Sequence, residues 1–291
     1  MAETELSLAR LSTEKQLRKY YNDWQEAVIL IEAYSMLKDM YSQISEKAKL
    51  RLKSGDVTSL EAELSDFEAN DATFELQSLS LRRDTLVMAM YRYAGLDADD
   101  VLINDDFVFY NFDTLGHSDV DTWIMTKYQG LREDNQLEFS VNKNNYKPEL
   151  GIEYFLSSAL ASNKEWRHGF SVSAAINLFD NESKGLKQVS QIREEQLNMS
   201  LFNEQIRRKQ IVKALNLQLN QLKTQLDYYT KKGVNLSDDI NQKATLAFEN
   251  QEINYLQYFQ LIQKSIEIRI KQIQLQAKYN SILIDRNFTI N

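Results

Sequence analysis

The sequence contains no cysteine, one proline and eight glycines in 291 residues. The absence of cysteine excludes disulfide bonds and thiolate chemistry, and it is compatible with an oxidising compartment without demanding one. Proline and glycine are disfavoured inside helices, because proline lacks a backbone N–H and glycine loses the most backbone entropy. Their scarcity therefore predicts a mainly helical protein with its glycines at helix ends, in turns or in strands.

Long hydrophobic runs and an excess of basic residues are also missing. No stretch approaches the roughly 18 apolar residues of a transmembrane helix. The start of the chain is polar and lacks the apolar segment of a secretory signal, so we expect either a soluble cytoplasmic protein or a mature or trimmed form. The net charge of −8 argues against nucleic acid as a partner.

Residue patterns typical of catalytic or metal sites are absent. The two histidines, His117 and His168, are far apart and have no cysteine or carboxylate neighbours at metal-site spacing, so we interpret both as surface residues. No phosphate-binding glycine loop or nucleophile motif is present. The sequence therefore predicts no enzyme, no metal site and no cofactor.

The last third of the chain, from about residue 181 to 285, has the strongest helical pattern. Apolar residues recur at helical spacing on both sides of Gly233. They are Ile211, Leu215, Leu219, Leu222 and Leu226 before it, and Phe259, Ile262, Ile266, Ile270 and Ile273 after it. Each arm of about fifty residues would be roughly 75 Å long at 1.5 Å per residue. The pattern predicts a long antiparallel helical hairpin with its turn at Gly233.

The first 95 residues predict another helical hairpin. A helical stretch over about residues 6–52 ends before Gly55, which suits a helix C-terminus because glycine adopts the left-handed conformation without steric cost. A second helix follows and ends before Gly95. The apolar face of this second helix consists of Leu60, Leu64, Phe67, Phe74, Leu81 and Met88.

The start of that second helix has a capping signal. Thr58 or Ser59 can accept a hydrogen bond from an exposed backbone N–H, and the segment that begins at Thr58 has the spacing of a capping box. A glycine, a short turn and a hydroxyl residue also occur in this order at Gly233 and Ser237. With Gly55 aligned to Gly233, 178 positions later, we interpret the chain as two copies of one hairpin.

Residues 96–147 predict a connector with a short helix at about 131–146, ended by Pro148. The connector contains an acidic cluster that lacks the central glycine and final glutamate of a calcium-binding loop, so we favour a solvated connector over a metal site. The acidic residues are Asp97, Asp99, Asp100, Asp105 and Asp106. We interpret the aromatic run at 107–112 as packing rather than ligand binding.

Residues 148–180 predict a β-hairpin with one apolar face. Two segments of period-two alternation, 150–157 and 170–178, flank the polar turn 162–165. Each segment is about ten residues, the length of a tilted strand that crosses a bilayer. The residues alone favour a small soluble sheet packed on a core. The alternative is a membrane hairpin, which must join others because a single hairpin leaves its edge groups unsatisfied in lipid.

The order of these elements resembles that of the TolC-like outer-membrane efflux proteins. The matching segments are Tyr146-Lys147-Pro148-Glu149-Leu150, Ile176-Asn177-Leu178-Phe179-Asp180, Gly55 to Leu60, Tyr93-Ala94-Gly95-Leu96, and Gly233 with Ser237. Each motif is short, and their order and spacing carry the resemblance over about four fifths of the chain. Asn177 stands where the family usually has proline, and Asn241-Gln242 stands where it usually has Leu-Asp.

The resemblance implies a mainly α fold with two long antiparallel helical hairpins of the coiled-coil tunnel type, plus a β-hairpin that can contribute to a trimeric β-barrel. The expected domains are residues 1–95 and 181–291 for the helical hairpins, 96–147 for an equatorial connector and 148–180 for the β-hairpin. Family members contribute four strands per copy, whereas this chain shows one β-hairpin. We therefore expect either a longer protein or a reduced relative.

The resemblance also implies a function. It indicates an outer-membrane exit duct of a tripartite efflux pump or type I secretion system, a passive conduit with a periplasmic helical part that opens at its tips. The implied partners are two further copies of the chain, a periplasmic adaptor protein, an inner-membrane transporter and outer-membrane lipid. The implied adaptor-contact residues are Gly55, Thr58, Ser59, Gly233 and Ser237.

Asp238 and Asp239 occupy the place of carboxylates that constrict the tunnel in the family. The residues alone favour another role for them, as first-turn carboxylates that complement the positive end of a helix dipole. The alternative function for the whole chain is a soluble coiled-coil scaffold or partner-binding protein.

Overall fold

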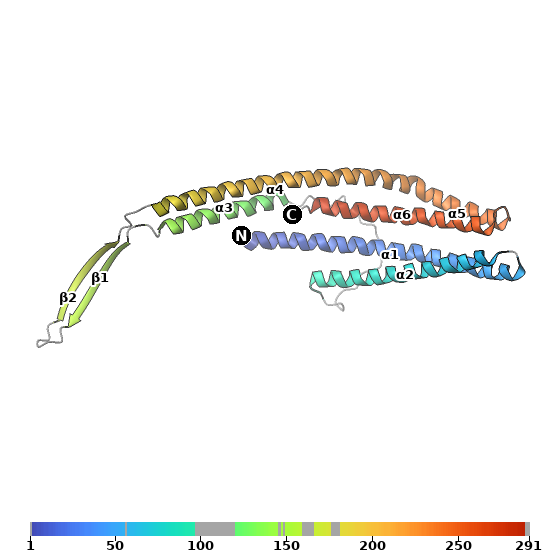
Figure 1. Cartoon of the computed structure of the whole chain (residues 1–291), viewed down its shortest axis with the longest axis horizontal. Helices are drawn as coiled ribbons and strands as arrows, with labels where there is room; N and C mark the ends of the chain where they lie inside the picture. The colour runs from blue at the N-terminus through green and yellow to red at the C-terminus, as the bar shows by residue number, and fades with distance from the viewer. Residues whose placement is uncertain are drawn as a thin grey trace. The chain divides into compact units, whose positions relative to one another are not determined.

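The computed structural model describes residues 2–55, 57–96, 120–144, 147, 149–158, 166–175 and 181–288. They form long helices and one β-hairpin, so the predicted fold class is confirmed (Figure 1). The helices are α1 (Ala2–Ser54), α2 (Ser59–Ala94), α3 (Val120–Asn144), α4 (Asn181–Tyr228), α5 (Val234–Glu249) and α6 (Tyr255–Asn287), with a π-helical turn η2 (Tyr229–Gly233) between α4 and α5. None of the described helices is long and apolar enough to cross a membrane.

The chain divides into two compact units, residues 1–6 with 121–207, and residues 7–120 with 208–291. The predicted acidic cluster and aromatic run of the connector lie outside the described residues, as do His117 and Pro148. His168 is described and exposed.

The unit of residues 121–207 contains the β-hairpin. β1 (Glu149–Ser158) and β2 (Trp166–Ala175) pair antiparallel, with Tyr154 opposite Phe170 and Ile152 opposite Val172. The predicted hairpin and its apolar face are thus confirmed over the described residues. The favoured interpretation of a sheet packed on a core is wrong for the single chain, because the large apolar side chains of this face are exposed.

In the same unit, α3 packs beside the first part of α4. The side-chain amide of Asn135 donates to the backbone carbonyl of Ser190 at 3.0 Å, and the Tyr128 hydroxyl donates to Glu204 at 2.7 Å. Burial, together with this carboxylate, raises the pKa of Tyr128 to about 12. These contacts orient the two helices through polar side chains that are mostly withdrawn from water.

The helix α3 is longer than predicted. It begins at Val120 instead of about residue 131, and Gly130 lies in its interior rather than at an end. An interior glycine costs about 1 kcal/mol relative to alanine. Ile124 and Tyr128, both buried in the part that the prediction missed, supply packing that outweighs this cost.

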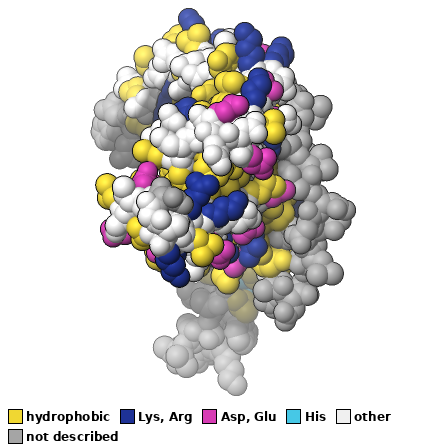
Figure 2. All heavy atoms as spheres, turned by 90° about the vertical axis from the view of Figure 1, so that its right-hand side faces the viewer, with side chains coloured by type: hydrophobic (Ala, Val, Ile, Leu, Met, Phe, Trp, Pro, Cys, Tyr) yellow, Lys and Arg dark blue, Asp and Glu magenta, His cyan; other side chains and the backbone are white. Residues whose placement is uncertain are grey.

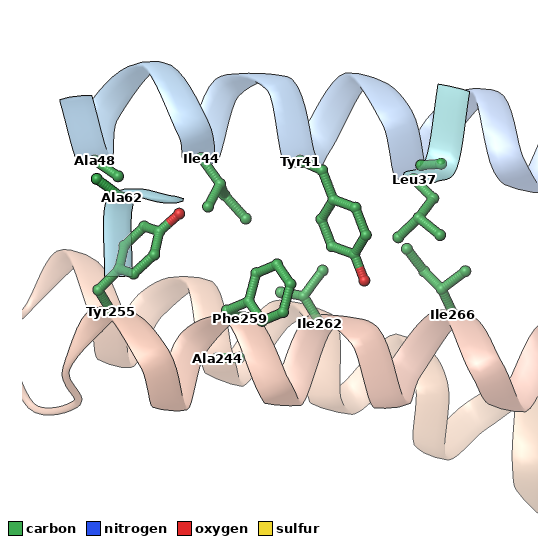
Figure 3. Close-up of a cluster of buried hydrophobic side chains, with 11 residues drawn as sticks. Leu37, Tyr41, Ile44, Ala48, Ala62, Ala244, Tyr255, Phe259, Ile262 and Ile266 are labelled. Carbon is green, nitrogen blue, oxygen red and sulfur yellow. The ribbon is translucent and has the colours of Figure 1, made fainter. Parts of the chain in front are cut away.

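The second unit, residues 7–120 with 208–291, is built around the contact of α1 with α6. Figure 3 shows Leu37, Tyr41 and Ile44 of α1 facing Phe259 and Ile262 of α6. Small residues from the flanking helices complete this cluster, namely Ala62 and Ala72 from α2 and Ala244 from α5. The apolar stripe predicted for α6 is therefore confirmed as core.

Polar contacts fix the register of α1 on α6. The buried Asn22 side chain donates to the backbone carbonyl of Ala277 at 3.0 Å. Lys15 and Lys19 pair with Asp285 at 2.9 and 2.8 Å. Burial alone would raise the pKa of Asp285, but the hydrogen bonds and charges of the two lysines outweigh it and lower the pKa.

Candidate functional site

The first hairpin tip is the turn between α1 and α2. Gly55 has a φ of +80°, a left-handed conformation that is strained for other residues, although no atom would obstruct a Cβ there. The backbone conformation, and not the space, therefore requires glycine. The predicted residues Gly55, Thr58 and Ser59 all lie at this turn.

Thr58 is the N-cap of α2 and forms a complete capping box with Glu61. The backbone N–H of Glu61 donates to Thr58 Oγ1 at 3.3 Å, and the backbone N–H of Thr58 donates to Glu61 Oε2 at 2.8 Å. The hydrogen bonds from Thr58, backbone first, lower the pKa of Glu61. Ser59 is the first residue of the helix and donates its hydroxyl to Glu63 at 2.9 Å. Of the two predicted caps, Thr58 fills the role.

The second hairpin turns at residues 250–254, so the predicted turn at Gly233 is wrong. Gly233 has a φ of −64° and lies in helical backbone that continues from η2 into α5. Gln251 has a φ of +61° at the actual turn, and Asn254 caps α6 in a capping box with Gln257. The predicted position relied on glycine as the residue in the left-handed conformation, whereas a glutamine adopts this conformation at the actual turn.

The two tips are equivalent at a spacing of 196 positions, from Thr58 to Asn254, rather than 178. The same spacing relates the two positive-φ residues, Gly55 and Gln251. The repeat itself is therefore present, and the predicted register was wrong. A search for capping boxes would have found it, because Asn-x-x-Gln is as valid a capping pattern as Thr-x-x-Glu.

Gly233 and Ser237 lie where the η2–α5 segment packs on α6. A Cβ at Gly233 would come within 3.2 Å of the Ile268 side chain. Ser237 is fully buried and donates its hydroxyl to the carbonyl of Ser265 at 2.8 Å, while the Ser265 hydroxyl donates to the carbonyl of Ser237 at 2.8 Å. Both residues therefore hold the helical pair together, and the Ser237 side chain is withdrawn from any adaptor surface.

Asp238 and Asp239 are exposed carboxylates with cationic partners. Asp238 pairs with Arg269 of α6, which also donates to the Ser237 hydroxyl at 3.2 Å. Asp239 pairs with Lys243 at 3.1 Å, one helical turn later. The interpretation as first-turn carboxylates is wrong, because the helix continues backward through η2 and has no free N-terminus here.

The two tips lie next to each other in one unit. The guanidinium of Arg51, at the end of α1, sits over the ring of Phe248, near the end of α5, at 5.2 Å. The Phe248 ring stacks on Tyr258 at 4.6 Å. Figure 2 looks onto this end of the molecule, where hydrophobic side chains reach the surface among Lys, Arg, Asp and Glu. This end therefore presents apolar contact area, and its surface charges are a mixture of positive and negative.

The large apolar residues of α2 point away from the core. Phe67 and Phe74 are each 65% exposed. The buried residues of α2 are mostly small, namely Ala62, Ser65, Ala72 and Leu79. The exposed stripe repeats every seven residues and consists of Leu60, Phe67, Phe74, Leu81 and Met88. The apolar face predicted for this helix therefore does not pack within the chain. Alanine and serine let α2 approach its own core, and the stripe has coiled-coil spacing for another helix.

Solved structures share this fold over nearly the whole chain. A membrane protein from Pseudomonas aeruginosa superposes with a TM-score of 0.82 at 12% identity, covering 99% of this chain and 70% of the other. The outer membrane protein VceC from Vibrio cholerae gives 0.76 at 13% identity, with coverages of 99% and 72%. The CmeC outer membrane channel of Campylobacter jejuni gives 0.72 at 14% identity, with coverages of 98% and 64%.

No protein-family model matches the sequence, and no curated protein matches it either. At identities of 12–14% the likeness is one of fold.

Proposed function

Because the chain has the fold of the TolC-like outer-membrane channels, we propose that it is an exit duct of a tripartite efflux pump or type I secretion system. The duct is a passive conduit with no catalytic step. The exposed heptad stripe of α2 is the observation that carries the proposal, because within a single chain no other helix covers these large apolar side chains.

A ring of three chains accounts for the stripe. In the unit of residues 7–120 and 208–291, the α4–α5 arm exposes large residues of its own, Leu217, Tyr228, Leu236 and Leu246. The α2 stripe of one copy can pack on this arm of the next copy, in a head-to-tail contact that closes when the rotation per copy is right. The homotrimer is therefore the proposed assembly.

The β-hairpin is the proposed contribution of each copy to a membrane barrel in the outer membrane. Its two strands have ten residues each, and one face exposes Ile152, Tyr154, Phe170 and Val172. An apolar face of that length is suited to lipid, provided that neighbouring hairpins satisfy its edge hydrogen bonds. The helices then form the periplasmic part.

The hairpin tips are the proposed contact with a periplasmic adaptor, which in turn joins an inner-membrane transporter. Gly55, Thr58 and Ser59 supply the first tip, and the turn around Gln251 and Asn254 replaces Gly233 and Ser237 at the second. The cation–π contact of Arg51 with Phe248 links the two tips. A partner that docks at one tip can therefore change the position of the other.

Assembly in detergent tests the proposal. Size-exclusion chromatography with light scattering should give three chains per particle, and the same particles should produce discrete conductance steps in a planar lipid bilayer. A monomer or dimer that stays in solution without detergent and carries no current would favour the soluble coiled-coil scaffold instead.

The proposed gate at Asp238 and Asp239 has its own test. Replacing both by alanine should raise single-channel conductance, because the change removes carboxylates and frees Arg269 and Lys243 from their ion pairs. Asp227→Ala, at an exposed carboxylate earlier in the same arm, is the control and should leave conductance unchanged. If the double variant conducts like the wild type, neither carboxylate gates a pore. Asp238 then serves only its ion pair with Arg269 of α6, and Asp239 only its ion pair with Lys243 within α5.

A further inference from the structure

A groove of about 210 Å³ lies where α1, α2 and α6 meet. All of its lining residues belong to the unit of residues 7–120 and 208–291, so it exists in a single chain. Its apolar lining consists of Leu37, Ala72, Ile266 and Ile270. The assembly proposed above assigns no role to this groove.

Tyr41 is one of the residues that line this groove. Tyr41 is only 2% exposed, and its ring stacks on Phe259 with the ring centres 4.8 Å apart. Figure 3 shows the side chain extending from α1 toward α6 with its hydroxyl at the far end. Within the described residues this hydroxyl makes no hydrogen bond. The hydroxyl oxygen is not among the enclosed unpaired atoms of the described residues, so it opens onto the groove, where it can form a hydrogen bond with an occupant.

One wall of the groove carries uncompensated negative charge. Glu68, Asp71 and Glu75 line it from α2, and no lysine or arginine pairs with any of them within the described residues. Burial raises the pKa of Tyr34 and Tyr41. The charges of Glu75 and Asp71 raise the pKa of Tyr34 further, and those of Glu68, Glu267 and Asp71 raise the pKa of Tyr41 further. Burial and the charge of Asp71 raise the pKa of Glu68 as well. The groove therefore favours a positively charged occupant.

The occupant is larger than a metal ion. Among the described residues no three carboxylates or histidines are arranged to hold a metal. The acidic wall instead faces an apolar floor and two tyrosine rings, which can attract an organic cation through their faces. This combination of an apolar surface with a few oriented polar groups is typical of small-molecule sites.

We propose that this groove binds an organic cation, a protonated amine with an apolar or aromatic body. The ammonium group lies between Glu68 and Asp71 and donates a hydrogen bond to the Tyr41 hydroxyl. The apolar body lies on Leu37 and Ile266. The site stands on one chain and is independent of trimer formation and of the exit-duct function.

A pair of probes with one body and two head groups tests the charge requirement. 1-Naphthylmethylamine is protonated at neutral pH, and 1-naphthalenemethanol is its neutral counterpart. Isothermal titration of the full chain in detergent, with protein-free micelles as the blank, should show saturable binding of the amine at one site per chain and about tenfold weaker binding of the alcohol. Equal binding of the two probes would overturn the proposal.

Three variants locate the site. Glu68→Gln combined with Asp71→Asn should weaken amine binding about tenfold, since both unpaired carboxylates are neutralised. Tyr41→Phe keeps the ring and the packing, and should weaken the amine about threefold while leaving the alcohol unchanged. Glu63→Gln, on α2 outside the groove, is the matched control with wild-type affinity. Wild-type affinity in the first two variants, with helix content intact by circular dichroism, would place the amine elsewhere and refute the groove.

Discussion

Replacing both Phe67 and Phe74 by lysine should convert the trimer into single chains. Each ring is 65% exposed in one chain, so the change leaves the fold of the chain intact. In the proposed trimer the same positions are covered by the next copy, and an unpaired charge buried there costs about 3–5 kcal/mol. Light scattering in detergent should report one chain per particle, with unchanged helix content by circular dichroism.

The control for this pair is Gln260→Lys with Gln274→Lys. These residues are exposed on α6, which carries neither of the two surfaces proposed to meet between copies, and the change adds the same charge. This variant should remain trimeric. If the phenylalanine variant also remains trimeric, the heptad stripe is not the interface, and the main support for the exit-duct assembly is lost.

Ile262→Ala should be the most destabilising truncation in the contact of α1 with α6. The side chain is 0% exposed and lies in the cluster with Leu37, Tyr41 and Phe259, so its loss leaves a cavity between helices. Buried isoleucine-to-alanine changes cost about 2–5 kcal/mol. The midpoint of guanidinium unfolding, followed by helix signal in detergent, should fall accordingly.

Leu261→Ala is the neighbouring control. Leu261 is 39% exposed and lies outside the buried clusters, so its truncation should cost less than about 1 kcal/mol. Comparable losses for the two variants would mean that the face of α6 assigned to the core is wrong. An unchanged midpoint for Ile262→Ala alone would contradict the packing of α1 on α6.

Local signals in the sequence were sufficient for much of the candidate site. At the first tip, Gly55 and the Thr58–Glu61 capping box act within a few residues, so no distant neighbour is needed to predict them. The second tip was missed because its left-handed residue is Gln251, which is no glycine. In the folded turn, the backbone N–H groups of residues 250–252 donate to carbonyls at the end of α5, and these hydrogen bonds support that conformation.

The groove around Tyr41 shows a different limit. Tyr34 and Tyr41 come from α1, Glu68 and Asp71 from α2, and Ile266 from α6. Each residue is unremarkable in its own helix. Their meeting depends on how three helices pack, which no spacing along the chain records.

By itself, the sequence determined that the chain is mainly helical, that the helices are long, and that one β-hairpin has an apolar face. These properties follow from the scarcity of proline and glycine and from apolar periodicity, and both act locally. The tertiary structure decided which face of α2 is covered. Alanine at Ala62 and Ala72 fits a close neighbour, and the larger Phe67 and Phe74 are left outside, because side-chain volume selects a face only once a partner helix is in place.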